Sequence, residues 1–330
     1  MSAKMKKLIL ATTFLLCACQ LLAVSADPAA QQLFAAAKQQ ASLFHKETGP
    51  FQLDVDFVAQ VQTPLQGHLT LKWESSDRWW QKATMADFVE IKLRNGEMVY
   101  TSHNAGFTPI RLQELINLLH FAEYGDRMVA RKQKQRVEDG VEVTCLRAEN
   151  EAGRSTPHEV CVNSASREIL RDEWKNASDD QRMERYAEYF DFQGHRYPRK
   201  LELLVNGSKV ITANVTNLTS TPLDQALLAA PKGAIERRLC KGMTRAVPIK
   251  TPEPMYPKSA SENRLMGDTI VSMTVLTDGS VNNIQLLGTS THSMDDATLQ
   301  TIKTWKFKPA MCGAEPVVSD VEVVVSFSLQ

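Results

Sequence analysis

The stretch Ser290–Ala310, with the sequence STHSMDDATLQTIKTWKFKPA, decides the fold of the C-terminal third of this chain. Its first half has helical spacing, because Met294, Ile302 and Trp305 lie close to one stripe of an α-helix. Ser293 is the expected N-cap residue, with an acidic residue three positions later. The stretch therefore predicts a short helix whose last inward anchor is Trp305.

The residues after this helix predict extended structure. Phe307 is expected to pack inward while Lys306 and Lys308 point to solvent, and Pro309 prevents further helix. Downstream, EPVVSDVEVVVSFSLQ (residues 315–330) has apolar residues at every second position. This pattern predicts that the chain finishes in a strand with one buried face.

The residues before the helix predict a second helix and a hairpin. MYPKSASENRLMG (residues 255–267) has Pro257 at its expected first turn. DTIVSMTVLTDGSVNNIQLLG (residues 268–288) is typical of a hairpin with its turn at Asp278–Gly279. The order of helix, hairpin, helix and strand predicts a small α/β domain of two layers.

Several motifs of this region, taken in order, resemble the C-terminal domain of the TonB family. They are a P-x-Y-P motif, a glycine before the first long strand, a DG turn and WKFKPA, that is Pro254, Tyr256, Pro257, Gly267, Asp278, Gly279 and residues 305–310. The resemblance covers residues 252–330. It implies a periplasmic domain that binds an extended peptide, the TonB box of an outer-membrane receptor, along its last strand by β-augmentation.

The resemblance also implies which residues lie near such a peptide. They are Glu253, Tyr256, Val318, Asp320, Glu322, Val324 and Ser326. Tyr256 fits a packing position under the helix equally well. Two features depart from TonB: the N-terminal segment looks cleavable, and a sheet domain takes the place of the long proline-rich spacer.

The N-terminal residues 1–26 have the composition of a secretory signal peptide. Lys4 and two further lysines precede an apolar run at residues 8–22, and small residues precede Asp27. We therefore expect cleavage after residue 26 and a periplasmic protein. The alternative is a lipoprotein signal, since LCAC ends at Cys19, which would anchor the chain in an envelope membrane.

Residues 27–233 predict a helix followed by many strands. The Ala- and Gln-rich residues 27–48 favour a helix with Asp27 as N-cap. From Phe51 onward apolar residues alternate with polar ones, with hairpin turns such as Asn95–Gly96. About a dozen half-buried strands favour a large antiparallel sheet, curved or closed.

This N-terminal region resembles the LolA/LolB lipoprotein-carrier fold in element order and in the segments GHLTLKW…DRWW, FVEIKLRNGEMVY and AAPKGA. The resemblance implies an α+β protein whose curved sheet forms a half-barrel over an apolar cavity. Candidate cavity residues are Phe57, Trp73, Trp79, Trp80 and Tyr100. Each of them also fits an ordinary core or cross-strand position. Residues 234–251 are polar and contain prolines, which predicts a linker.

Four cysteines remain after the expected cleavage. Cys145 and Cys161 lie in consecutive strand candidates, roughly opposite across a hairpin, which predicts a disulfide; two buried free thiols are the alternative. A bond between Cys240 and Cys312 would close a loop of roughly seventy residues, with a stabilisation of ~4 kcal/mol.

Composition limits the classes of function. Lys plus Arg equals Asp plus Glu, at 38 each, so charge gives no support for nucleic-acid binding. We find no zinc-ligand spacing, no catalytic motif and no cofactor motif. The expected function is a non-catalytic periplasmic binding protein that acts in transport with outer-membrane components. The alternative is a carrier or sensor of a lipid-like apolar ligand in the half-barrel, with membrane contact only through the signal segment or a lipid anchor.

Overall fold

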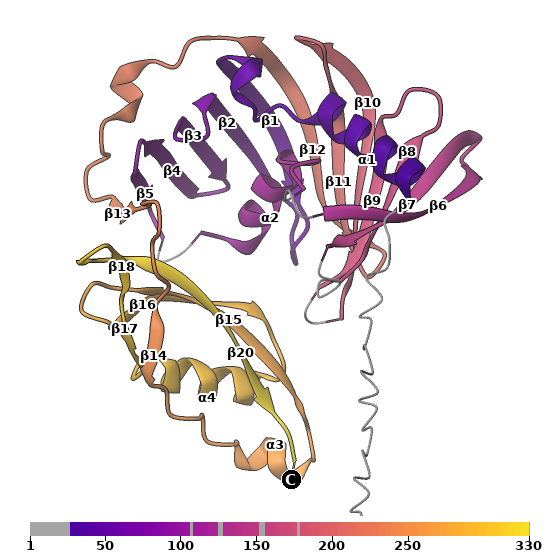
Figure 1. Ribbon diagram of the computed structural model, residues 1–330. Helices are drawn as coiled ribbons and strands as arrows, with labels where there is room; N and C mark the ends of the chain where they lie inside the picture. The colour runs from indigo at the N-terminus through magenta and orange to yellow at the C-terminus, as the bar shows by residue number, and fades with distance from the viewer. Residues whose placement is uncertain (1–26, 106–107, 125–127, 152–155, 177–178, 330) are drawn as a thin grey trace, which may run out of the picture.

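The computed structural model describes residues 27–329 apart from residues 106–107, 125–127, 152–155 and 177–178 (Figure 1). The expected signal peptide and Cys19 lie outside these residues. Within the described part, no helix is both long and apolar enough to cross a bilayer.

Two helices pack on the large sheet. Helix α1 (Pro28–Ala41) begins as expected, because the Asp27 carboxylate accepts hydrogen bonds from the amides of Ala29 and Ala30 at 3.0 and 3.3 Å. Helix α2 (Ile110–Leu119) buries one apolar face. Short 3-10 turns lie at η1 (Lys46–Thr48) and η2 (Gln225–Leu228).

The largest sheet among the described residues is antiparallel and has 13 strands. Their order is β13-β5-β4-β3-β2-β1-β12-β11-β10-β9-β8-β7-β6. Its strands are β1 (Phe51–Ala59), β2 (Leu65–Ser75), β3 (Arg78–Met85), β4 (Phe88–Asn95), β5 (Met98–His103), β6 (Met128–Glu138), β7 (Val141–Asn150), β8 (His158–Asn163), β9 (Ile169–Lys175), β10 (Gln181–Phe192), β11 (His195–Val205), β12 (Ser208–Ser220) and β13 (Ile235–Arg238).

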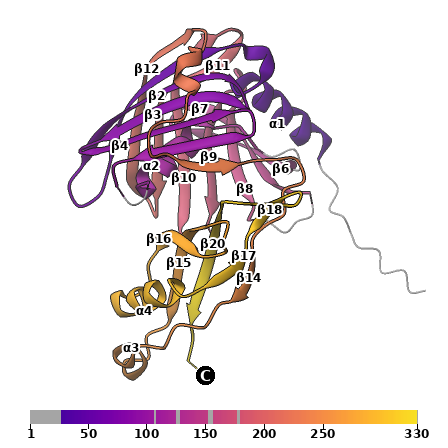
Figure 2. The same cartoon turned by 90° about the vertical axis from the view of Figure 1, so that its left-hand side faces the viewer.

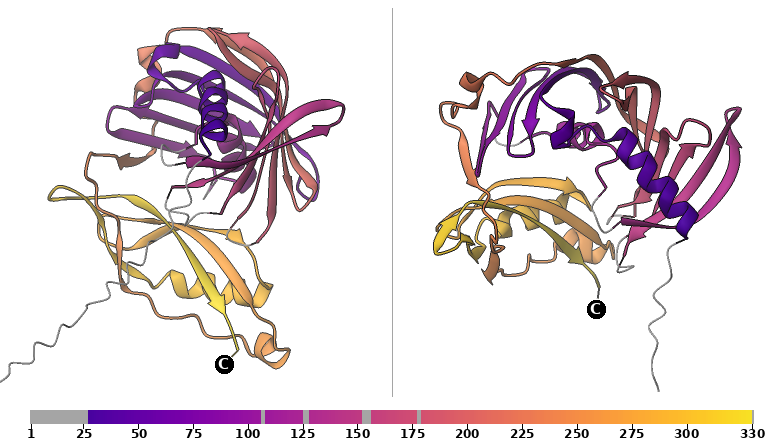
Figure 3. Two further views of the ribbon diagram at one scale, coloured as in Figure 1. Left: turned by 45° about the vertical axis from the view of Figure 1, so that its right-hand side comes forward. Right: turned by 45° about the horizontal axis from the view of Figure 1, so that its top comes forward.

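The sheet curves strongly around α1 and α2, and its end strands β13 and β6 do not pair with each other (Figure 3). The buried side chains of β1, every second residue from Phe51 to Ala59, join those of both helices in one core. Gly67 on β2 makes room for this core, because a Cβ there would lie 2.2 Å from the Phe57 ring. The sheet is therefore a half-barrel whose concave side is covered in part by α1 and α2.

The C-terminal region lies below the open side of the half-barrel (Figures 1 and 2). Its elements are β14 (Val247–Lys250), α3 (Lys258–Glu262), β15 (Gly267–Val275), β16 (Val281–Gly288), α4 (His292–Ile302), β17 (Lys306–Lys308), β18 (Ala310–Cys312), β19 (Glu315–Val317) and β20 (Ser319–Phe327). Strands order as β16-β15-β20, with the small pairs β14-β17 and β18-β19 beside them. The predicted α+β fold, with a curved antiparallel sheet and a small two-layer unit, is confirmed.

The stretch that opened the sequence analysis folds largely as expected. Trp305 and Phe307 are 8% and 4% exposed and pack with Val271, Met273 and Ile302 from the sheet and α4. The two flanking lysines are exposed.

The predicted cap of α4 is wrong. Thr291, with extended backbone angles, is the N-cap, and its hydroxyl accepts from the Met294 amide, while Ser293 lies within the first turn. Asp295 is buried and accepts hydrogen bonds from the Ser290 amide and the Thr269 hydroxyl. A polar contact to the preceding loop therefore moves the helix start by two residues.

Residues 234–251, expected to be a linker, contain two strands. Ile235–Arg238 pairs with β5 and extends the large sheet beyond residue 233, and Val247–Lys250 pairs with β17. The sequence did not predict these strands because each is only four residues long and contains prolines or charged residues.

Candidate functional site

Strand β20 is at the edge of the C-terminal sheet, where its one partner among the described strands is β15. Val321, Val323 and Val325 face α4 and pack on the core around Trp305. The alternate side chains face away from α4. One side of β20 has no neighbouring strand in this sheet. The main-chain amide and carbonyl groups on that side therefore have no partner strand.

The seven side chains predicted near a bound peptide fall into three groups. Glu322, Val324 and Ser326 are exposed on the face of β20 that turns away from α4. Val318 is half-buried at the junction with β19. Glu253 is exposed in the segment before α3. Asp320 and Tyr256 have other contacts.

Tyr256 has a packing role in the structure. Its ring meets Phe327 edge to face at 5.4 Å, and its hydroxyl donates to the carbonyl of Leu265. Ala260 of α3 and Met294 of α4 complete this small cluster. The side chain therefore secures the end of β20 to the two helices.

Asp320 is tied to the large sheet. Arg237 on β13 forms an ion pair with it at 2.9 Å, and the Thr274 hydroxyl donates to the same carboxylate at 2.8 Å. Nearby, Gln113 of α2 donates to Gln285 of β16 at 3.1 Å. These contacts hold the C-terminal sheet, by the face opposite α4, against the open side of the half-barrel.

A cavity of about 520 Å³ lies at this junction. Lys92, Arg94 and Thr101 line it from the half-barrel, and Ser272 and Gln285 line it from the C-terminal sheet. A second cavity, of about 370 Å³, continues into the half-barrel and has Trp79, Lys92 and Ile116 in common with the first.

The five predicted cavity residues divide between the two faces of the sheet. Trp73 and Trp79 line the inner cavity, whereas Phe57 is 2% exposed within the core. Trp80 and Tyr100 pack on the opposite face with Leu93, Leu223 and Leu228, so their assignment to the cavity is wrong. The reason is the period of two, which sends Trp80 away from Trp79.

Polar side chains are also buried inside the half-barrel. The Tyr124 hydroxyl donates to Asp172 at 2.8 Å, His158 lies 2.9 Å from the same carboxylate, and the Tyr186 hydroxyl donates to Glu184. Burial, with the negative charge of Asp172, raises the pKa of Glu184 to about 7. These groups satisfy one another, which is a structural role. No motif in the sequence indicates the cluster, because its members lie on distant segments.

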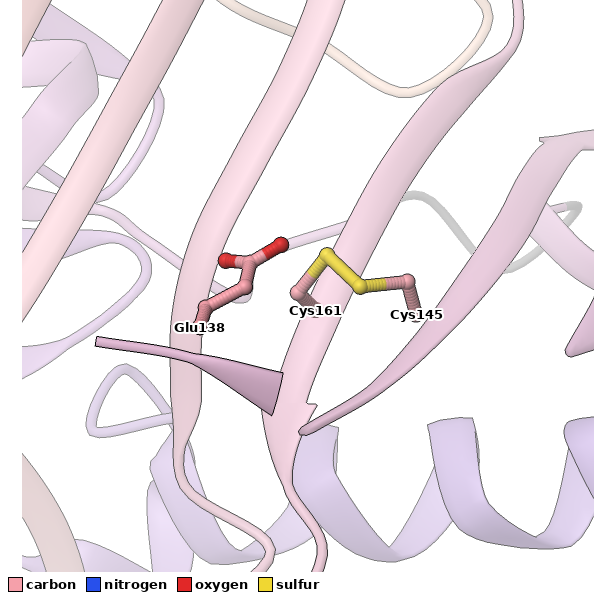
Figure 4. A group of neighbouring side chains, drawn as sticks. All are labelled: Glu138, Cys145 and Cys161. Carbon is pink, nitrogen blue, oxygen red and sulfur yellow. A yellow bond between two sulfur atoms is a disulfide. The ribbon is translucent and has the colours of Figure 1, made fainter. Parts of the chain in front are cut away.

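The structure pairs Cys145 with Cys161 and Cys240 with Cys312. The first pair lies directly opposite across β7 and β8. Figure 4 shows the carboxylate of Glu138 beside this disulfide, a grouping that is close enough for a metal site. Both sulfur atoms are in the S–S bond, so the group offers no thiolate ligand.

Comparison with known proteins finds a match for the C-terminal region. Residues 252–329 match the family model described as Gram-negative bacterial TonB protein C-terminal. Protein TonB of Vibrio cholerae is 29% identical over 79 residues, which are 24% of this chain and 32% of that protein. The chain thus matches about a third of that relative's length. The family match confirms the resemblance stated for residues 252–330.

Two solved structures also match, with low identity. A LolA superfamily protein from Nitrosomonas europaea has 12% identity and a TM-score of 0.41, covering 61% of this chain and 97% of that chain. The TonB C-terminal domain of Pseudomonas aeruginosa has 23% identity and a TM-score of 0.24, covering 27% and 97%.

Proposed function

Because residues 252–329 are a TonB-like C-terminal domain, we propose that this chain is a non-catalytic binding protein of the bacterial periplasm. The domain captures an extended segment of an outer-membrane receptor or another periplasmic protein. The captured segment adds as a strand beside β20. The observation that carries this proposal is the strand order β16-β15-β20, which leaves β20 at an edge.

The chemistry of the edge supports a main-chain mode of capture. Unpaired amide and carbonyl groups along β20 supply hydrogen bonds to any extended segment, and alternate side chains supply selectivity. Glu322 is exposed and has no ion-pair partner among the described residues. It therefore favours a basic residue directly opposite on the captured strand.

The proposal also assigns the compartment and the domains. Export through residues 1–26, or a lipid anchor at Cys19, places the protein in the periplasm or on an envelope membrane. Residues 27–233 and 252–330 act as two domains, to which the intervening segment contributes β13 and β14.

A pair of proline substitutions tests the edge. Only alternate amides of an edge strand point outward, so Glu322→Pro and Val323→Pro must differ in their effect on binding. We expect one of them to abolish binding of a receptor-derived TonB-box peptide and the other to destabilise the pairing with β15. Glu322→Gln keeps every main-chain group and removes only the side-chain charge, so it separates the contribution of the side chain from that of the main chain.

Binding is measured by calorimetry, and hydrogen exchange of β15 checks that each variant is folded. Titration of the full chain and of a fragment of residues 239–330 shows whether the large sheet restricts access to the edge. Absence of binding to both, or equal binding by all variants, would refute peptide capture at β20.

A second candidate function is the carriage or sensing of a lipid-like ligand in the half-barrel. The observation that favours it is the inner cavity of about 370 Å³, which has Phe44, Leu71, Trp73 and Trp79 in its wall. This volume falls within the range of small-molecule sites, about 300–1,000 Å³.

A further inference from the structure

We propose that the inner cavity binds a single-chain anionic amphiphile. Its carboxylate or phosphate group lies at Lys92 and Gln81, and its chain lies against Trp73 and Trp79. The inference rests on the second candidate function and adds the chemical class of the ligand.

The concave wall changes from apolar to charged across three neighbouring strands. The cross-strand rows from β2 through β3 to β4 are Leu69–Ala83–Glu90, Leu71–Gln81–Lys92 and Trp73–Trp79–Arg94. In each row the β2 residue is apolar and the β4 residue is charged. A ligand that lies across this wall meets hydrocarbon at one end and charge at the other.

Gln81 is a buried polar group without a partner. Its side chain is 4% exposed and lines the inner cavity, and its amide nitrogen has no hydrogen bond among the described residues. Buried polar groups in folded proteins are nearly always hydrogen-bonded, so an unpaired amide that lines a cavity needs a partner such as a bound water, an ion or a ligand. The amide is therefore available to a ligand in the cavity.

Lys92 is directly opposite Gln81 in the pairing of β3 with β4. Within the described part of the chain, no carboxylate oxygen lies within 4.0 Å of its ammonium group. The lysine lines both cavities and is only partly exposed. An ammonium group that lines a cavity without a counterion favours an anionic ligand group.

The neighbouring charged groups are already occupied. Glu90 accepts a hydrogen bond from the Thr108 hydroxyl, and Arg94 donates to the carbonyls of Gly96 and Ser76 at 3.0 and 2.9 Å. Lys92 also lines the inner cavity, whereas Arg94 lines only the outer one.

The other titratable groups that line the inner cavity are Glu123 and His120, and Arg237 lines the outer cavity. Glu123 accepts from the Ser42 hydroxyl, and Arg237 is paired with Asp320. Burial lowers the pKa of His120, which keeps its ring neutral near pH 7. The anionic group therefore meets Lys92 without competition from a second free cation at that position.

The apolar end of the cavity accepts a chain. Phe44, Leu71 and Trp73 line it together with the Trp79 ring, which reaches both cavities. A soluble anion would leave this aromatic surface empty, and a neutral lipid would leave Lys92 and Gln81 without a partner. An amphiphile with a negative group satisfies both parts of the wall.

The test uses the full chain and isothermal calorimetry with five probes: dodecanoate, dodecyl phosphate, neutral monododecanoylglycerol, acetate and inorganic phosphate. We expect the two anionic amphiphiles to bind at least about tenfold more tightly than the neutral one, as a charge-assisted hydrogen bond provides. Acetate and inorganic phosphate are expected not to bind measurably.

Variants locate the anionic group. Lys92→Met is expected to reduce the affinity for dodecanoate to that of the neutral probe and to leave the neutral probe unchanged. Gln81→Leu is expected to weaken dodecanoate as well. Lys82→Met changes an exposed lysine next to Gln81 on the other face of β3 and is the matched control. If Lys92→Met does not fold, Lys92→Gln replaces it.

The outcomes separate the two proposals. Equal affinity for charged and neutral chains, or an unchanged affinity in Lys92→Met, overturns the anionic site and leaves the carrier function standing. Inorganic phosphate that binds as tightly as dodecyl phosphate overturns the amphiphile. Absence of binding by every chain-bearing probe overturns both the site and the carrier function.

Discussion

Replacing Trp305 with alanine is expected to destabilise the C-terminal domain by ~3–5 kcal/mol, as truncation of a large buried side chain does. Trp305 is 8% exposed, contacts the core around Val271 and Ile302, and donates from Nε1 to the Pro252 carbonyl at 3.0 Å. A domain of roughly 80 residues has about 4–12 kcal/mol of total stability. The substitution therefore removes a large part of what keeps this domain folded.

Hydrogen exchange of the full-length protein measures the effect in each domain separately. Amide protection in β15 and β20 is expected to fall by about 100-fold or more, and protection in β1 and β12 is expected to remain. Trp305→Phe keeps an aromatic ring and loses the Nε1 donor, so its smaller effect separates packing from the hydrogen bond. A loss of protection below about tenfold in Trp305→Ala would refute the role of Trp305 as an anchor.

Three further predictions follow from other contacts. Replacing Cys240 and Cys312 together by serine is expected to lower the stability of the C-terminal domain by ~4 kcal/mol, because the bond spans 72 residues; chemical denaturation measures this loss. Glu184→Gln is expected to flatten the decline in stability between about pH 4.5 and 7, since the folded state holds a proton there that the unfolded chain releases; thermal unfolding across this range measures it. Gly279→Ala is expected to destabilise the protein by more than ~2 kcal/mol, because its φ is +76° and a Cβ would lie 1.9 Å from the Phe307 carbonyl oxygen; urea unfolding measures it.

Each of these has its own counter-result. Stability of the double serine variant equal to that of the oxidised wild type argues against a constraint on the unfolded chain. The pKa of Glu184 at about 7 against 4.5 unfolded corresponds to roughly 3 kcal/mol, so identical pH profiles contradict its burial. Gly140→Ala is the control for Gly279, because its φ is also positive at +79° but nothing lies within 4 Å; equal losses would exclude the clash.

Periodicity predicted the buried face of single elements better than it predicted which elements lie next to each other. The alternation from Phe51 to Ala59 gave the correct buried face of β1, and the spacing that ends at Trp305 gave the buried side of α4. Both patterns persist over several turns or residues, so local sequence was sufficient. Local sequence was insufficient for Trp79 and Trp80. Because both are aromatic and adjacent, only the pairing of β3 with β2 and β4 decides which of them faces the cavity.

The candidate sites depended on contacts between distant residues. Gln81 belongs to no sequence motif. Only its position opposite Lys92 in the folded sheet identifies it as a candidate site residue. Arg237 lay in an expected linker, yet it pairs with Asp320, 83 residues later. The edge position of β20 came from the family resemblance and not from its own alternation, which an interior strand with one buried face would also show.

The Cys240–Cys312 bond also determines how tension travels through the molecule. Cys240 follows β13 closely, and Cys312 precedes β20 by a few residues. A pull on a segment bound to β20 therefore passes along the backbone to Cys312, across the sulfur atoms, and into β13. Residues 241–311 form a side loop that carries no covalent tension. The contacts of β13 with β5 and of Arg237 with Asp320 therefore lie on the path of this tension, whereas α4 and Trp305 belong to the side loop.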